Sequence, residues 1–202
     1  MHRIASLVTL WVCLSLFLKD AEGNSRLQLA VVHNGDSVGS LLIEQRIHGD
    51  ETTYTLTSQV SVQFLVQFLV EEQIVDVFND GLLVHSSHQR HINGVLKATH
   101  ALTRKADKYQ VVDKDNRFYQ LHEKILATVV SIYFHEPHPG QWVYSQNYKK
   151  LLPLEKTGEG CYRIQLPNGT TSKYRYLSGV LSEVETNTHI GTLKFINKHI
   201  ER

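Results

Sequence analysis

The sequence predicts an all-β fold, a sequential antiparallel meander of about a dozen strands that curls into a barrel or β-roll and carries one short helix. Two observations indicate this class. Apolar and polar residues alternate with a period of two through most of the 202 residues, which is typical of strands with one buried face. Short sequences rich in Asn, Asp and Gly separate the alternating segments, as hairpin turns do. A meander of this length curls because an open sheet leaves twisted edges exposed.

The clearest alternation lies in the segment 160–197, which reads as consecutive strands joined by tight glycine turns. Pro167-Asn168-Gly169 fits a three-residue hairpin loop, with the glycine in the left-handed position of a bulge. This loop sets Tyr162 opposite Tyr174. Asn168-Gly169-Thr170 also matches the N-glycosylation pattern, but the turn alone is a sufficient reason for an Asn-Gly pair at this position.

A second loop of the same length is expected at Leu177-Ser178-Gly179. It sets Tyr176 opposite Val180 on one face and Lys173 opposite Glu183, an opposite-charge pair, on the other. The tyrosines of the apolar face are the candidate ligand-binding residues, because rings with polar tips suit the wall of an apolar cavity; they equally suit an ordinary sheet core. These residues are Tyr162, Tyr174 and Tyr176.

The start of the chain has the features of a secretory signal peptide. Met1-His2-Arg3 is basic, residues 4–18 are almost wholly apolar, and Ala21-Glu22-Gly23 places small residues before a cleavage point. The apolar run is too short for a comfortable membrane span. We therefore expect residues 1–23 to be a signal peptide and residues 24–202 to be a single β-barrel or β-roll domain, with no membrane span after cleavage.

Cysteine and charge content bound the location and the partners. Cleavage removes Cys13 and leaves Cys161 as the single cysteine, so the exported protein is held together by core packing rather than by an internal disulfide. This favours a bacterial periplasm or bacterial extracellular surface. The leader takes two bases and two acids with it, which leaves the net charge at +1. We therefore expect no nucleic-acid partner; the sequence does not indicate a protein partner.

The other strands follow in order, each bounded by turn residues. Turn sequences stand at Asn34-Gly35-Asp36, His48-Gly49-Asp50, Asn79-Asp80-Gly81 and Asn93-Gly94. The expected strands cover residues 27–33, 37–47, 52–63, 71–78, 82–91, 95–105, 109–113 and 118–122, then 142–154 as a long strand or bent pair, and finally 191–196 after the C-terminal hairpins.

Two segments depart from plain alternation. Val62-Gln63-Phe64-Leu65 is followed at once by Val66-Gln67-Phe68-Leu69. We interpret this repeat as a strand with a bend or bulge near Leu65 rather than as a helix, because no cap precedes it and strands flank it. Residues 125–134 lack a period of two and have apolar residues that share a helical face, which predicts a short helix that plugs or covers the sheet. Pro137 forbids its continuation.

Several turn and core motifs point to a known family. They are Val77-Phe78-Asn79-Asp80-Gly81-Leu82-Leu83, Ile132-Tyr133-Phe134-His135-Glu136-Pro137, Tyr162-Arg163-Ile164-Gln165-Leu166-Pro167-Asn168-Gly169, Tyr174-Arg175-Tyr176 and Val184-Glu185. With them, the mature chain resembles DUF6134, a family of exported bacterial proteins, many from Bacteroidetes, classed only as a domain of unknown function. The resemblance implies a secreted or periplasmic β-rich domain, and it brings no catalytic residues.

Twelve histidines raise the question of a metal site in the hairpin 85–100. Three of them, spaced three apart, alternate between the faces of a strand and so cannot converge on one metal. These are His85, His88 and His91. A two-residue loop at Asn93-Gly94 sets His100 opposite Ser87, and a three-residue loop sets it opposite Ser86. The apolar pattern does not choose between them. No third ligand is evident, so we assign no metal site and no cofactor.

No GxSxG, HExxH, P-loop or dinucleotide fingerprint occurs in the sequence, so we assign no catalytic residues and expect no enzymatic activity. The first functional hypothesis is an exported domain that holds a hydrophobic small molecule or lipid in its interior. The second is an envelope structural or protein-interaction module with a filled core, and the third is an enzyme that uses a histidine site. A continuous cavity on the order of several hundred Å³ favours the first hypothesis over the second.

Overall fold

The computed structural model describes residues 22–63, 67–188 and 191–199. These residues form fourteen strands in one antiparallel sheet. The strands are β1 (Glu22–His33), β2 (Asp36–His48), β3 (Glu51–Gln63), β4 (Gln67–Asn79), β5 (Leu82–Ile92), β6 (Val95–Lys105), β7 (Lys108–Asp113), β8 (Phe118–Leu121), β9 (Trp142–Ser145), β10 (Lys150–Gly158), β11 (Cys161–Gln165), β12 (Thr171–Leu177), β13 (Val180–Thr188) and β14 (Gly191–Asn197). The all-β class and the antiparallel meander predicted from the sequence are confirmed.

Tight turns with left-handed residues join the strands of the first half. Asn34-Gly35, Asp80-Gly81 and Asn93-Gly94 each have two positive φ angles, as two-residue type I′ hairpin turns require. Asn, Asp and Gly adopt these angles at little cost. The strands therefore reverse where the sequence predicted, and the period of two places one face of each strand in the core.

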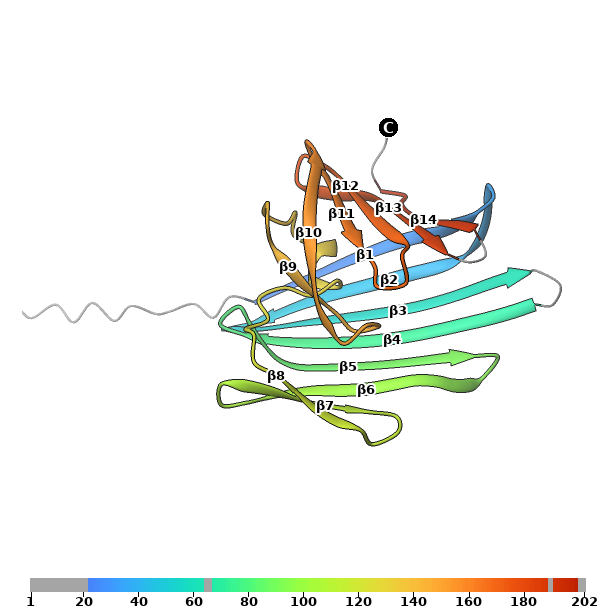
Figure 1. Ribbon diagram of the computed structural model, residues 1–202. Coiled ribbons are helices and arrows are strands. Elements are labelled where there is room, and N and C mark those ends of the chain that lie inside the picture. The colour runs from blue at the N-terminus through green and yellow to red at the C-terminus, as the bar shows by residue number, and fades with distance from the viewer. Residues whose placement is uncertain (1–21, 64–66, 189–190, 200–202) are drawn as a thin grey trace, which may run out of the picture.

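The sheet curls but does not close. Its strand order is β8-β7-β6-β5-β4-β3-β2-β1-β14-β13-β12-β11-β10-β9, so β8 and β9 are its two end strands and the first strand pairs with the last in the middle. In Figure 1 the long strands β1–β6 form one broad layer, and the shorter strands β10–β13 run across their direction in a second layer. One hydrophobic core cluster contains residues of both layers. The architecture is an incomplete barrel.

The two C-terminal hairpins differ in how well the sequence predicted their register. Tyr162 lies opposite Tyr174, as predicted. The second loop is the two-residue turn Ser178-Gly179, in which both residues have positive φ, and not the three-residue loop expected. A bulge at Ser182 then shifts the pairing by one more residue. The predicted cross-strand pairs are therefore wrong: Tyr176 faces Leu181 and not Val180, and Lys173 faces Glu185 and not Glu183. Val180 is therefore exposed and Leu181 is buried in its place, whereas Val184, beyond the bulge, keeps its predicted place on the buried face.

The segment predicted as a helix covers the core but is helical only as a single 3₁₀ turn, Ser131–Tyr133. The residues before it run extended, because their backbone bonds go to strands far away in the sequence. Ile125 accepts a hydrogen bond from the backbone N–H of Leu83, and Tyr144 exchanges backbone hydrogen bonds with Ala127 and Val129, each at 2.9 Å. We call residues 125–136 the plug, because most of their side chains are buried against the sheet.

The tandem repeat at residues 62–69 divides between two strands. β3 ends at Gln63 and β4 begins at Gln67, and these two residues pair with each other in an antiparallel hairpin. The single bent strand predicted for this repeat is therefore wrong, because the chain reverses direction between Gln63 and Gln67. Residues 64–66 lie outside the described residues.

The predicted signal peptide, residues 1–23, lies outside the described residues except for its last two. Glu22 and Gly23 begin β1 and pair with His48 and Ile47 of β2. In the described ranges, no helix has the length and apolar character needed to cross a membrane.

Polar side chains tie the connection between β9 and β10 to the far part of the sheet. The three contacts run from Gln146 Nε2 to Asp76 Oδ2 (2.7 Å), from Arg90 Nη2 to Asn147 Oδ1 (2.8 Å) and from Lys149 Nζ to Asp113 Oδ2 (3.4 Å). They join the connection to β4, β5 and β7. The β9–β10 connection is thereby held against the first half of the sheet without strand pairing.

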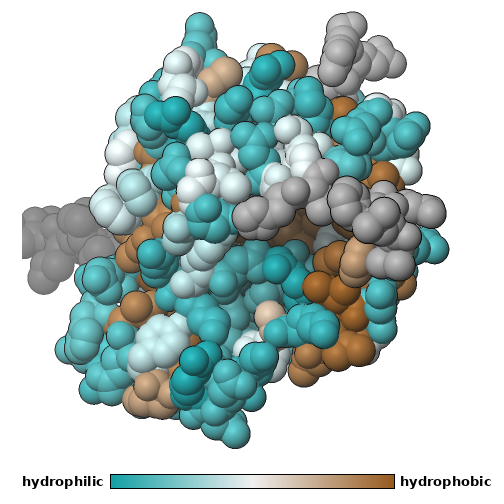
Figure 2. All heavy atoms as spheres, turned by 45° about the vertical axis from the view of Figure 1, so that its right-hand side comes forward, coloured by the Kyte–Doolittle hydropathy of each residue, from teal (hydrophilic) through white to brown (hydrophobic). Residues whose placement is uncertain are grey.

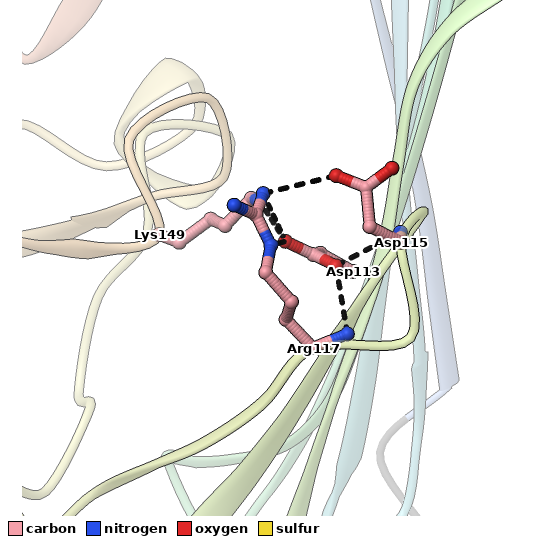
Figure 3. Close-up of polar contacts among 4 residues, drawn as sticks. All are labelled: Asp113, Asp115, Arg117 and Lys149. Carbon is pink, nitrogen blue, oxygen red and sulfur yellow. Dashed lines mark hydrogen bonds and ion pairs between the residues drawn. The ribbon is translucent and has the colours of Figure 1, made fainter.

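Asp113, which binds Lys149, also accepts several other hydrogen bonds (Figure 3). Its carboxylate accepts hydrogen bonds from Arg117 Nε at 2.8 Å and from the backbone N–H groups of Asp115 and Arg117. The hydrogen bond from the Arg117 side chain, with these backbone donors and Lys149, lowers the pKa of Asp113 well below its usual value. Asp113 therefore stays ionised and fastens the β7–β8 turn to Lys149.

Gly39 in β2 marks a close approach of two strands and gives a first test of the fold. A β-carbon at Gly39 would lie 2.1 Å from the carbonyl oxygen of Gln59 and 2.8 Å from the α-carbon of Val60. Because both are backbone atoms of β3, Gly39→Ala is expected to lower the free energy of unfolding by about 2 kcal/mol or more. Urea denaturation followed by circular dichroism measures this loss.

Gly158 provides the matched control for this substitution. Its β-carbon would meet its nearest neighbour, Cys161 Cβ, at 3.7 Å, which is an ordinary contact. Gly158→Ala is expected to change the free energy of unfolding by no more than about 0.5 kcal/mol. Equal losses in the two variants would contradict the close approach of β2 and β3.

Candidate ligand-binding cavity

A cavity of about 380 Å³ lies between the two layers. One wall is the inner face of β2–β5, and the other is the inner face of β11–β14. Residues 129–133 of the plug and residues 145–148 of the β9–β10 connection also line it. The cavity is thus the part of the barrel interior that the plug does not fill.

The lining of the cavity is apolar in its depth and polar at its rim. Its buried apolar residues include Leu41, Leu56, Ile74, Ile164 and Val184. Its exposed or half-buried polar residues include Asn147, Asn168, Thr170 and Asn187. Figure 2 shows a hollow near the centre of the molecule, with hydrophobic side chains within and beside it and hydrophilic side chains around it. An apolar interior with a few polar groups is the usual composition of a small-molecule site.

Tyr174 is the predicted site residue that lines the cavity, and a second tyrosine lines it with Tyr174. The ring of Tyr133, from the plug, meets that of Tyr174 edge to face, with centroids 6.4 Å apart. In the described part of the chain, neither hydroxyl has a hydrogen-bond partner. Burial raises the pKa of both hydroxyls above the usual value. Both phenols therefore stay protonated and offer a donor to a bound molecule.

Tyr162 and Tyr176 are buried like Tyr174, at 2 % and 3 % exposure, but their hydroxyls hold the plug. The hydroxyl of Tyr176 donates to the carbonyl oxygen of Ile132 at 2.5 Å, and that of Tyr162 donates to Glu136 Oε1 at 2.8 Å. Burial and the bond to Glu136 raise the pKa of Tyr162 to about 12. Neither tyrosine lines the cavity. All three inner-face tyrosines point inward, as predicted, and they serve two different purposes.

A paired acid and base stand in the cavity wall. Glu72 Oε1 accepts hydrogen bonds of 2.7 Å from both Arg90 Nη2 and the ring of His88. Burial opposes ionisation of Glu72, but the hydrogen bond from His88 and the charge of Arg90 outweigh it and lower the pKa of Glu72. Glu72 therefore stays ionised beside Arg90, which also donates to Asn147.

Sequence reasoning missed Glu72 as a site residue, although the alternation contained a signal. Glu72 has the same parity as Ile74 and Phe78, which face the core in β4. A carboxylate at an inward position needs a partner, and Arg90 lies on the neighbouring strand. Tyr133 was assigned to a covering segment, and its place on the cavity became visible only in three dimensions.

The histidine hairpin has a register that differs from both alternatives considered. The Asn93-Gly94 loop has two residues, and a bulge between Arg90 and His91 then shifts the pairing, so that His100 faces His88. The two rings are buried with centroids 5.2 Å apart. Burial and the neighbouring His88 lower the pKa of His100 to about 3. Across the described ranges, no three His, Cys, Asp or Glu residues gather in a way that would hold a metal ion.

A larger space, of about 850 Å³, lies at the seam where the sheet fails to close. Leu121 of β8 and Trp142 of β9 line it together with Leu126 of the plug. Leu126 and Trp142 are 64 % and 55 % exposed. Ligand sites bury most of the surface of their ligand, whereas this groove leaves its apolar residues in water. The cavity between the layers is therefore the better candidate for a small-molecule site.

The sequence as a whole matches one protein family, described as a domain of unknown function (DUF6134), over residues 30–198. The chain belongs to the DUF6134 family. The resemblance inferred from the turn and core motifs is thereby confirmed. The matched range of this DUF6134 protein extends from β1 to the end of β14 and includes every strand that lines the cavity.

The fold of this DUF6134 protein has a counterpart among solved structures. It is similar to the crystal structure of a beta-barrel-like protein of domain of unknown function DUF1849 from Brucella abortus, with a TM-score of 0.53 and 8 % sequence identity. The alignment covers 85 % of this chain and 94 % of that chain. At this identity the likeness shows the fold alone. No curated protein matches the sequence.

Asp76, which anchors the β9–β10 connection beside the cavity, gives a pH-dependent prediction. Its carboxyl is fully buried, and burial raises its pKa above the ordinary value despite the hydrogen bond from Gln146. As pH rises above about 3.9, the unfolded chain loses this proton before the folded chain does, so the free energy of unfolding falls. Asp76→Asn removes this loss. Its stability relative to the wild type is expected to increase from pH 4 to pH 7, by about 1.4 kcal/mol for each unit by which the pKa is raised.

Urea denaturation of both proteins across this pH range measures the difference. Asp107→Asn, in the exposed β6–β7 turn, is the control and is expected to keep the wild-type pH dependence. If the difference in free energy of unfolding between Asp76→Asn and the wild type stayed constant from pH 4 to pH 7, burial would not hold the Asp76 carboxyl protonated.

Proposed function

We propose that this DUF6134 protein is an exported, non-enzymatic domain that holds a hydrophobic small molecule or a lipid in the cavity between its two layers. The observation that supports the proposal is the cavity of about 380 Å³ itself. It has about two and a half times the volume of the ~150 Å³ cavity that takes up benzene in an engineered protein. A fully packed core leaves few voids larger than a water molecule.

The apolar lining supplies the driving force for such binding. Burial of apolar surface contributes about 25 cal/mol for each Å². A ligand that buries about 300 Å² therefore gains about 7 kcal/mol before the cost of association, which favours weak to moderate affinity. The protonated hydroxyls of Tyr133 and Tyr174 give the ligand a fixed orientation, because each offers one donor in an otherwise apolar space.

Export to a bacterial periplasm or cell surface is part of the proposal and has independent support in the sequence. Residues 1–23 combine a basic start, an apolar stretch and small residues before a cleavage point, which is the pattern of a signal peptide. The remaining single cysteine, Cys161, is unpaired. N-terminal sequencing of the protein secreted by its bacterial host tests this part, and a mature protein that begins at Met1 would contradict it.

The direct test of ligand binding starts from purified protein that has been delipidated. After incubation with a bacterial lipid extract and gel filtration, native mass spectrometry is expected to show the protein with one bound molecule. Protein that retains nothing under these conditions would count decisively against the proposal.

A substitution that fills the cavity makes the same test specific to this site. Ser58 of β3 is buried and lines the cavity, so Ser58→Phe places a ring in the ligand volume. We expect it to reduce the amount of retained lipid about tenfold, the effect of about 1.4 kcal/mol. Thr57→Phe is the control, because Thr57 is exposed on the opposite face of the same strand. Equal retention by both folded variants would place the ligand elsewhere.

The alternative function is a structural or protein-interaction module. The seam groove favours it, since Leu126 and Trp142 are exposed there and β8 has one side without a neighbouring strand in the described sheet. Extended peptides often bind by adding a strand to such an edge. In that case Trp142→Ala would abolish the interaction, and Ser58→Phe would leave it unchanged.

A further inference from the structure

The charges in the cavity wall restrict the ligand that the cavity accepts. Among the described residues that line it, Glu72 and Arg90 are the charged ones. They are bonded to each other at 2.7 Å, in a place where the Glu72 side chain is only 16 % exposed. The opposite charges of the pair therefore cancel, and the described wall offers a ligand no charged side chain without a counter-charge.

The rest of the polar lining carries no charge. It consists of hydroxyl and amide groups, among them Ser58, Gln146, Asn147 and Thr170, with phenols that include those of Tyr133 and Tyr174. Hydroxyls and amides can donate and accept hydrogen bonds. They match the hydrogen bonds of alcohols, esters and amides.

We propose that the ligand is an uncharged amphiphile, with an alkyl or ring portion in the apolar depth and a hydroxyl, ester or amide group at the polar lining. This inference rests on the proposed function and narrows it to one ligand class. Fatty acids and alkylammonium ions are excluded as preferred ligands.

The physical reason is the cost of burying an unpaired charge. A carboxylate or ammonium loses its hydration when it enters the buried part of the cavity, and only a counter-charge there compensates the loss. Arg90 is already engaged by Glu72 and Asn147, and Glu72 is engaged by Arg90 and His88. The buried Nε of Arg90 has no partner, but a carboxylate bound there would lie beside the ionised Glu72 and be repelled by it. An ammonium at Glu72 would likewise be repelled by Arg90. An alcohol enters without that cost.

The test compares three ligands of equal chain length: 1-decanol, decanoate and decylammonium. Each displaces the uncharged fluorescent probe N-phenyl-1-naphthylamine from the delipidated protein at pH 7. We expect 1-decanol to bind about tenfold more tightly than either ion. If the probe and all three ligands fail to bind, the proposed function fails. If an ion binds as tightly as 1-decanol, the function stands and the inference about charge is overturned.

Two variants test the role of the Glu72–Arg90 pair. Glu72→Gln leaves Arg90 without its counter-charge, and decanoate is expected to gain about tenfold in affinity relative to 1-decanol. Arg90→Gln removes the arginine partner of Glu72 and leaves it bonded to His88 alone, and the affinity of decylammonium relative to 1-decanol is expected to rise instead. Unchanged ligand preference in both folded variants would contradict the inference.

An exposed ion pair on the outer face provides the matched control. Lys173 Nζ lies 3.2 Å from Glu185 Oε1, away from the cavity lining. Glu185→Gln is expected to leave the preference among the three ligands unchanged. If a cavity variant fails to fold, as judged by circular dichroism, the ligand series on the wild-type protein still decides the question.

Discussion

The structure depends on the backbone hydrogen bonds between the plug and the sheet. A long curled sheet that does not close has an interior to fill and two layers to hold together. The plug meets both needs, because Ile125 bonds to Leu83 in β5 and residues 127–129 bond to Tyr144 in β9. The Tyr176 hydroxyl secures its other end. Without these bonds, the buried polar groups of the plug would have no partners and the layers no fixed spacing.

That spacing creates the cavity. The plug occupies one part of the interior and leaves a space of about 380 Å³ beside Tyr133. The same tyrosine face therefore has two roles: Tyr162 and Tyr176 hold the plug, and Tyr174 borders the space that it leaves. The Glu72–Arg90 pair keeps the wall of that space electrically balanced, which is why an interior that contains ions can still suit an apolar molecule.

The sequence was sufficient to predict which face of the sheet most strand side chains occupy, but not which residues pair across neighbouring strands. Alternation placed Tyr174 inward and Lys173 outward, because the side-chain direction in a strand depends only on local parity. The bulges at Ser182 and between Arg90 and His91 leave no residue pattern, so the partners of Tyr176 and His100 were not predictable. The conformation of the plug depends on Leu83 and Tyr144, which lie far from it in the sequence. The cavity depends on the separation of two layers, and no local pattern encodes that distance.

The pairing of β1 with β14 has a consequence for how the protein is made. It joins Leu29 to Asn197 and Val31 to Phe195, so the centre of the sheet forms only when the last strand is available. Contacts between residues so distant in sequence slow folding. Until β14 arrives, β1 presents a bare edge that recruits other chains. The half-made sheet is therefore the state of this fold that is most open to aggregation.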